Sequence, residues 1–333
     1  MTQQENSKTV SEDVAAFVKQ AGIYRQALID ARGTFTERLA ASERFAGSPP
    51  VPEIPREAYQ LPPIFYTSLV TSDTYRLIQR GRFLPSQAVT EDHVAQAREY
   101  VSNLLTVDLS NVRVELIPVD SWDSPSSEGM NIAMGFDNHL IFMPDHFSSP
   151  VEVLVHEFGH AAHATAARKN GVLASFYILP TTAEFVAHFC QFNYLLEHGS
   201  RAYFDAALHQ ITEAAYALSI ISTGITENFS EFMTTEASRA IAAVMSTHLL
   251  RERYENFRRD KAWLQNQAMR GIALILTLAL IDEKEGMIRF IHADRVDRSL
   301  EQKLTAAFLD VGVMEKVALI NEQISSLQGR FDR

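Results

Sequence analysis

Apolar residues recur at intervals of three and four along much of this chain, which is the spacing of one face of an α-helix. The first stripe of this kind runs from Val10 to Phe35 and predicts a helix or a helical hairpin. Gly22 and Gly33 lie within the stripe, and either glycine can bend or break a helix. We therefore expect the chain to begin with a helical segment that buries one face.

The pattern changes in the next part of the chain. A helix is predicted from Thr90 to about residue 105, because Thr90 can cap it and two acidic residues follow in the first turn. Residues 112–119 alternate between apolar and polar, which is typical of a strand. The stretches "MNIAMGF" and "HLIFMP" predict two more short strands, joined by a turn at Asp137-Asn138. Nearly everything after Ser149 has helical spacing, so the predicted fold class is mainly α with a small β-sheet before the next helix.

The chain has 333 residues, enough for one large domain or two smaller ones. The stretch 47–63 is rich in proline, which fixes φ and removes a backbone donor, so it predicts an irregular connector. We expect a helical segment at 1–46 before this connector and one large functional region at 64–333 after it.

The amino-acid composition disfavours several kinds of binding partner and cellular location. The formal net charge of -11 disfavours binding to nucleic acid or to an anionic membrane. Cys190 is the one cysteine, so there is no internal disulfide framework. The N-terminus lacks an apolar signal core, and the apolar run 271–281 is too short to span a bilayer. We expect that run to be a buried helix and the protein to be cytoplasmic. Its oligomeric state is left open.

The sequence "VEVLVHEFGHAAH" at 151–163 carries the strongest chemical signal. On a helix, His156 and His160 share one face and can direct two imidazoles at one metal ion. Glu157 lies beside the first of them and can reach a water molecule at that ion. The motif predicts one Zn²⁺ per chain, although two ordinary helix histidines would give the same bare pattern.

The third ligand decides the class of zinc site. In the metzincin pattern it would be a histidine at position 166, which is Ala166 here, and the preceding glycine is replaced by His163. The first carboxylate after the motif is Glu184, which follows a helix start near Pro180. His188 lies one turn further on the same face and could bind the metal instead. We therefore predict His156, His160 and Glu184 as ligands.

The segment "EVLVHEFGHAAH" resembles the active-site helix of thimet-oligopeptidase-like zinc peptidases. His156, Glu157, His160 and His163 match that family's motif residue by residue, and the step from His160 to Glu184 is close to the family's spacing. The preceding stretch resembles the strand pair along which a peptide lies in that family. The resemblance covers about residues 129–195. It implies a gluzincin-type metallopeptidase catalytic domain with a substrate cleft, and a packing or outer role for His163.

The chain also departs from this family. Glu184 is followed by Phe-Val-Ala-His where the family has E-x-P-S-Q, and the tyrosine-rich H-x-G-Y segment that stabilises the oxyanion is missing. The chain is about half the usual length. The oxyanion donor must then come from elsewhere, typically from a tyrosine or a histidine. We take His248 and Tyr254 as first choice; the other candidates are Tyr194, Tyr216 and His292.

The predicted function is a zinc-dependent peptidase that hydrolyses short peptides, with Glu157 as the general base for the attacking water. The arginine cluster at 251–259 is either a solvated helix face or a site for a peptide carboxylate. Two alternatives remain. One is a processing peptidase for a single precursor, or a zinc amidohydrolase. The other is a non-catalytic peptide-binding protein on a peptidase scaffold.

Overall fold

The structure is a computed structural model, and it describes residues 11–43, 50–67, 69, 71, 73, 75–76, 85–124, 129–209, 212–243 and 245–332. Val10, residues 44–49 of the predicted segment and connector, and residues 125–128 before the predicted strand pair lie outside the described part. The protein is mainly helical with a small amount of strand, which confirms the coarse fold class.

The elements before the motif helix are α1 (Glu12–Asp30), α2 (Phe35–Glu43), η1 (Arg56–Tyr59), η2 (Pro63–Tyr66), β1 (Gln87–Ala88), α4 (Glu91–Leu105), β2 (Arg113–Ile117), η3 (Val119–Ser121), β3 (Met130–Ile132), β4 (Leu140–Pro144) and β5 (His146–Phe147). Thr90 caps α4 as predicted, since its side chain accepts from the backbone N–H of His93. Helix α1 runs straight through Gly22. The chain breaks instead at Gly33, whose φ of 106° is disfavoured for other residues.

The remaining elements are α5 (Pro150–Arg168), η4 (Leu173–Ser175), α6 (Pro180–His198), α7 (Arg201–His209), α8 (Thr212–Thr223), α9 (Phe229–Phe232), α10 (Glu236–Ala242), α11 (Thr247–Arg259), α12 (Lys261–Ala279), α13 (Lys284–Ala293), α14 (Leu300–Ala307), α15 (Val313–Ala318), α16 (Ile320–Gly329) and η5 (Arg330–Asp332). The apolar run 271–281 forms the buried C-terminal half of α12 and the residues just after it, as predicted. No helix in the described ranges is long and apolar enough to cross a membrane.

The larger sheet has the strand order β2-β4-β3. Its central strand β4 pairs in parallel with β2 and antiparallel with β3, and every residue of β4 is buried. The predicted tight turn at Asp137-Asn138 is wrong, because β3 already ends at Ile132. The backbone N–H of Met134 donates to the imidazole of His139 at 2.7 Å instead of to a neighbouring strand. The connection therefore runs from residue 133 to residue 139.

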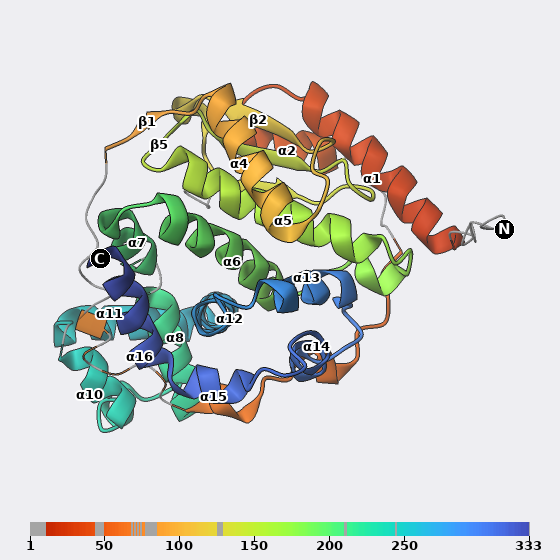
Figure 1. The fold of residues 1–333 in the computed structure, drawn as a ribbon. Helices are drawn as coiled ribbons and strands as arrows, with labels where there is room; N and C mark the ends of the chain where they lie inside the picture. Colours follow the sequence, from red (N-terminus) through yellow and green to blue (C-terminus); the bar gives the residue numbers. More distant parts are fainter. Residues whose placement is uncertain are drawn as a thin grey trace.

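The helices form layers on either side of the motif helix (Figure 1). Helix α5 packs against α4 on one side and α6 on the other, and α6 in turn packs against α12. The N-terminal helices cover the sheet, where Leu28 and Phe35 join a buried cluster with Leu140 and Phe142. The α5–α6 layer thus lies in the middle of the molecule.

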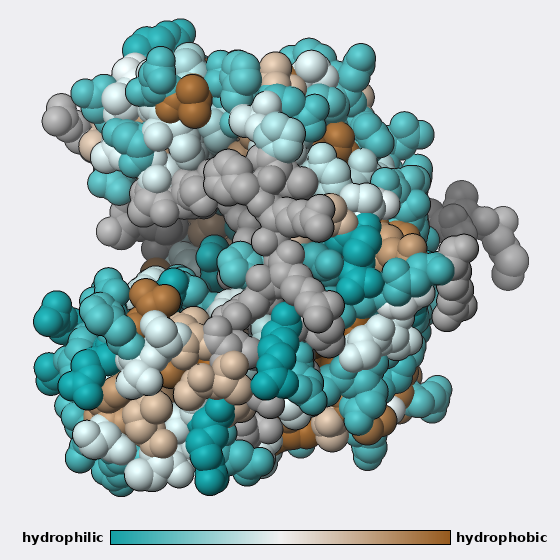
Figure 2. All heavy atoms as spheres, turned by 90° about the vertical axis from the view of Figure 1, so that its left-hand side faces the viewer, coloured by the Kyte–Doolittle hydropathy of each residue, from teal (hydrophilic) through white to brown (hydrophobic). Residues whose placement is uncertain are grey.

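The surface seen in Figure 2 is hollowed between the half that carries the sheet and the half that carries the C-terminal helices. Hydrophilic residues dominate this face, and apolar patches are scattered among them. The finer expectation, a gluzincin-type domain with a substrate cleft, stays a prediction.

Candidate metal centre

A glycine in the motif sets how closely the two central helices approach. A Cβ atom added to Gly159 would lie 2.8 Å from the Cα of Ala187 and 3.3 Å from the sulfur of Cys190. Only a residue without a side chain allows α5 and α6 to cross at this distance. The crossing brings the histidine face of α5 against the face of α6 that carries Glu184 and His188.

Three donor atoms converge at this crossing. The Nε2 atoms of His156 and His188 lie 3.5 and 3.6 Å from the same carboxylate oxygen of Glu184. Within the described residues, these three side chains form a group whose ligand atoms all lie within 4.8 Å of one another. Donor atoms around a tetrahedral zinc ion with bonds of about 2.0–2.1 Å are separated by about 3.3–3.4 Å. Two of the three separations are close to this value, so this group could hold a zinc ion.

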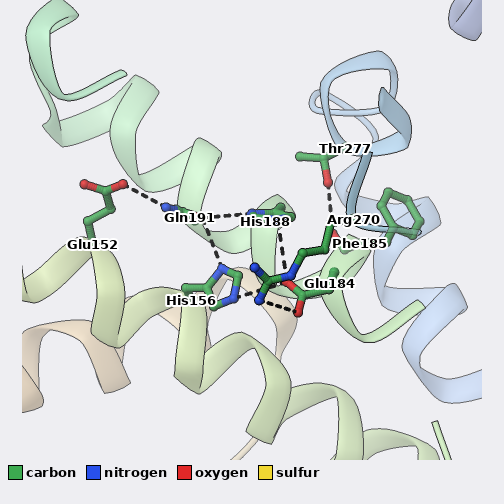
Figure 3. A network of polar contacts seen from close by, with 8 residues as sticks. All are labelled: Glu152, His156, Glu184, Phe185, His188, Gln191, Arg270 and Thr277. Carbon is green, nitrogen blue, oxygen red and sulfur yellow. Dashed lines mark hydrogen bonds and ion pairs between the residues drawn. The ribbon is translucent and has the colours of Figure 1, made fainter. Parts of the chain in front are cut away.

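A buried hydrogen-bond network orients both imidazoles (Figure 3). The side-chain carbonyl of Gln191 lies 3.1 Å from Nδ1 of His156 and 2.9 Å from Nδ1 of His188. The amide nitrogen of Gln191 donates to Glu152 at 2.8 Å, which fixes the direction of the amide. Both Nδ1 atoms must then carry the proton, and both Nε2 lone pairs point toward Glu184.

Sequence analysis missed Gln191 and Glu152, although their spacing contained a signal. Gln191 lies two turns after Glu184 on α6, and Glu152 lies one turn before His156 on α5. Both therefore share a face with a predicted ligand. Here an amide, supported by a carboxylate from the other helix, orients the histidines.

The pKa values of the cluster favour the protonation state that a metal needs. Burial lowers the pKa of His156 well below its ordinary value, lowers that of His160 to about 4, and also lowers that of His188. Burial alone would raise the pKa of Glu184, but the three histidines and Arg270 outweigh it and bring the pKa to about 2. At neutral pH the cluster thus consists of neutral imidazoles and a carboxylate, which is the state that binds a cation.

The position of His160 differs in part from the expectation. Its ring contacts the ring of His156, with centroids 4.8 Å apart, but His160 is not in the group of three converging donors. The structure brings His156 and Glu184 together as predicted and adds His188. His160 lies one turn along α5 from His156, and its role as a metal ligand stays a prediction.

Glu157 lies on the neighbouring face of α5, toward the sheet. Its side chain is buried, and a Cβ atom added to Gly129 would lie 3.0 Å from its carboxylate oxygen. Gly129 directly precedes β3, so the predicted general base faces the start of a sheet strand. A larger residue at 129 would push this carboxylate out of place.

His163 points away from the three donors into a separate buried ion cluster. Its Nε2 lies 2.8 Å from Asp294, whose other oxygen lies 2.7 Å from the ammonium of Lys303. Burial alone would raise the pKa of Asp294, but the contacts with His163 and Lys303 hold it well below its ordinary value. His163 thus connects α5 to the segment that follows α13 through its contact with Asp294.

The two tyrosines among the predicted oxyanion donors that lie on α8 and α11 donate their hydroxyl groups to the backbone. Tyr254 is buried, and its hydroxyl donates to the carbonyl of Ile225 at 3.2 Å. The hydroxyl of Tyr216 similarly donates to the carbonyl of Leu250. His248 is exposed on α11. The role of His248 and Tyr254 in oxyanion stabilisation stays a prediction without a contact to support it.

Comparison of the chain with protein-family models, with curated proteins and with solved structures finds no match. The resemblance to thimet-oligopeptidase-like peptidases therefore stays a prediction, carried by the motif residues alone.

Proposed function

We propose that this protein is a zinc-dependent peptidase. The observation that carries the proposal is the convergence of His156, His188 and Glu184 on one point, with both Nδ1 atoms held by Gln191. In many metal sites, residues that do not touch the metal hold the ligand histidines in orientation through hydrogen bonds, as Gln191 does here. The proposed ligands are His156, Glu184 and one further histidine, either His160, as the motif predicts, or His188, which lies in the converging group. Three ligands leave the open position that the attacking water needs.

Zinc bound there would supply Lewis acidity, which lowers the pKa of water and polarises a carbonyl group. Glu157 would take the proton from the attacking water and deliver it to the leaving amine. Its position on the ligand helix α5, beside the start of β3, suits this role, because β3 is an edge strand of the sheet and an extended peptide can lie along it. The reaction adds water across the peptide bond and yields a carboxylate and an amine.

The test is the variant Glu157→Gln, which keeps the size of the side chain and removes the base. We expect peptide turnover to fall by a factor of about 10²–10⁴, while the zinc content stays at one ion per chain. Glu197→Gln, at a half-exposed position near the end of α6, is the matched control and should keep normal turnover. Normal turnover in Glu157→Gln would exclude the proposed mechanism.

A further inference from the structure

Arg270 on α12 lies at the outer edge of the candidate metal centre. Its guanidinium lies 3.6 Å from the Oε1 atom of Glu184, whereas the imidazoles of His156 and His188 face Oε2 of the same carboxylate. Figure 3 shows the side chain reaching from α12 to Glu184. The side chain of Arg270 is 46% exposed, against 9–17% for the three donors, so the cation lies on the side of the donors that faces solvent.

The helix that carries Arg270 is held against the helix that carries Glu184. Thr277 lies two turns after Arg270 on α12, and its hydroxyl donates to the backbone carbonyl of Phe185 at 3.1 Å. Phe185 directly follows Glu184 on α6. Residues seven apart on a helix share a face, so the face of α12 that carries Arg270 is the face that packs on α6. The guanidinium therefore extends toward the donors from a fixed backbone.

The guanidinium of Arg270 has N–H groups available for a further acceptor. A separation of 3.6 Å is longer than a hydrogen bond, and among the described residues Arg270 has no hydrogen-bonded partner. Its charge nevertheless acts across the site: burial is the largest cause of the lowered pKa of His160 and of His188, and Arg270 lowers both further. A metal ion at Oε2 of Glu184 would take up the charge of that carboxylate, which leaves the guanidinium for another anion.

Hydrolysis of a peptide bond needs a donor of this kind. The oxygen of the scissile carbonyl gains negative charge when water adds to the carbon, and hydrogen-bond donors aimed at that oxygen lower the barrier. The hydroxyls of Tyr216 and Tyr254 donate to the backbone carbonyls of Leu250 and Ile225 instead. Arg270, by contrast, lies beside a proposed metal ligand with its N–H groups open to solvent.

From this arrangement we infer that Arg270 is the catalytic residue that stabilises the oxyanion, by donating hydrogen bonds from its guanidinium to the oxygen of the scissile carbonyl. The inference rests on the proposed function and names one more residue of the same site. A guanidinium presents five N–H donors in a planar fork and stays protonated in proteins. Arg270 can therefore stabilise the charge without giving up a proton.

The reaction is the hydrolysis already proposed, and no further reactant is required. The oxygen of water forms a bond to the carbonyl carbon, its proton goes to Glu157, and the π electron pair moves to the carbonyl oxygen. That pair returns as the C–N bond breaks, and the amine that leaves takes the proton from Glu157. Because the oxygen carries its charge only between these two events, Arg270 should bind the transition state more strongly than the substrate.

The experiment measures steady-state hydrolysis of internally quenched peptides by the zinc-loaded protein. Arg270→Gln should lower kcat by a factor of about 10²–10³, as the loss of one oxyanion donor does, and leave KM within about threefold of the native value. Arg270→Lys keeps the positive charge and should show a smaller fall in kcat. Arg239→Gln, which changes an exposed arginine of α10, is the matched control and should keep the native kcat.

Equilibrium binding is a second readout that does not depend on turnover. A phosphinic peptide carries a tetrahedral anionic group in place of the scissile bond, so it resembles the reacting carbonyl. Its affinity should fall in Arg270→Gln by about the factor by which kcat/KM falls. The zinc content should stay at one ion per chain. The affinity of the uncleaved peptide should be the same in Glu157→Gln with and without Arg270→Gln.

Three results would overturn the inference while the proposed function stands: a native kcat in Arg270→Gln, a higher KM in that variant with kcat unchanged, and a loss of zinc that accounts for the loss of turnover. The second would make Arg270 a residue that binds the ground state of the substrate. If the zinc-loaded native protein cleaves no peptide of the panel, the proposed function fails, and the role of Arg270 fails with it.

Discussion

At the residue scale, Gln191 determines how the two imidazoles are presented. One carbonyl oxygen accepts from both His156 and His188, and Glu152 keeps the amide from turning over. Without that acceptor each ring could rotate or exchange its protonated nitrogen. The geometry of the candidate metal centre therefore depends on a side chain outside the group of three donors.

Gln191→Leu removes this acceptor and keeps a side chain of similar volume. We expect affinity for zinc to fall by a factor of about 10 to 100, as is usual when a group that orients a ligand is lost. Competition with a fluorescent chelator measures this loss without reference to turnover. Asn193→Leu is the matched control, because among the described residues the Asn193 amide bonds to the carbonyl of Phe189 on the same helix and to no other group. Equal affinity in both variants would show that the rings are held by other contacts.

At the element scale, the crossing of α5 and α6 decides whether the two ligand pairs meet. His156 and His160 form one pair, and Glu184 and His188 form the other, each spaced four residues apart on its helix. Neither helix can supply the site alone. Gly159 sets their distance, because the backbone of α6 lies where a side chain would be.

Gly159→Ala therefore tests the crossing directly. The added methyl group would meet the backbone at Ala187, and we expect a loss of about 1–3 kcal/mol in the free energy of unfolding together with weaker zinc binding. Urea denaturation and chelator competition measure the two effects. Gly22→Ala in α1 is the control, because among the described residues its added carbon has no neighbour within 4 Å beyond the adjacent residues and the backbone of its own helix. It should stabilise the protein by about 0.5–1 kcal/mol. If Gly159→Ala raised the free energy of unfolding as much as Gly22→Ala does, the close approach of α5 and α6 at Gly159 would be contradicted.

At the scale of the whole molecule, the folded state holds several histidines in their neutral form. Burial lowers the pKa of His139 and of His156 well below the ordinary value and that of His160 to about 4. A histidine with a lowered pKa in the folded state takes up its proton first in the unfolded state. Its contribution to stability is therefore complete above the unfolded pKa of about 6.5 and is lost as pH falls toward the folded pKa.

We accordingly expect the metal-free protein to lose stability between pH 7.5 and pH 5.5. Each buried histidine contributes at most about 1.4 kcal/mol per pH unit below about pH 6.5. Urea denaturation at several pH values measures the slope. His139→Gln should make it shallower by the contribution of one histidine, since His139 is fully buried between Met134 and Thr165. Stability that is constant or rises over this range would contradict the assignment.

Local patterns in the sequence predicted the coarse fold class and placed the candidate donors on shared helix faces, although the turn before β4 was predicted wrongly. The cap at Thr90, the start of α6 at Pro180 and the shared faces of the two ligand pairs depend only on neighbours within one or two helical turns. Such spacings are visible in a single sequence. The position of His188 beside Glu184 was therefore predictable.

Tertiary structure decided the contacts between residues on different helices, because these contacts depend on how helices far apart in the sequence pack. No local pattern could indicate that Asp294 would contact His163 or that Arg270 would reach Glu184 from α12. A local pattern also could not indicate that the hydroxyl of Tyr254 would donate a hydrogen bond to the backbone carbonyl of Ile225. The sequence by itself determined which residues could bind a metal, and the packing of α5, α6 and α12 decided which side chains surround them.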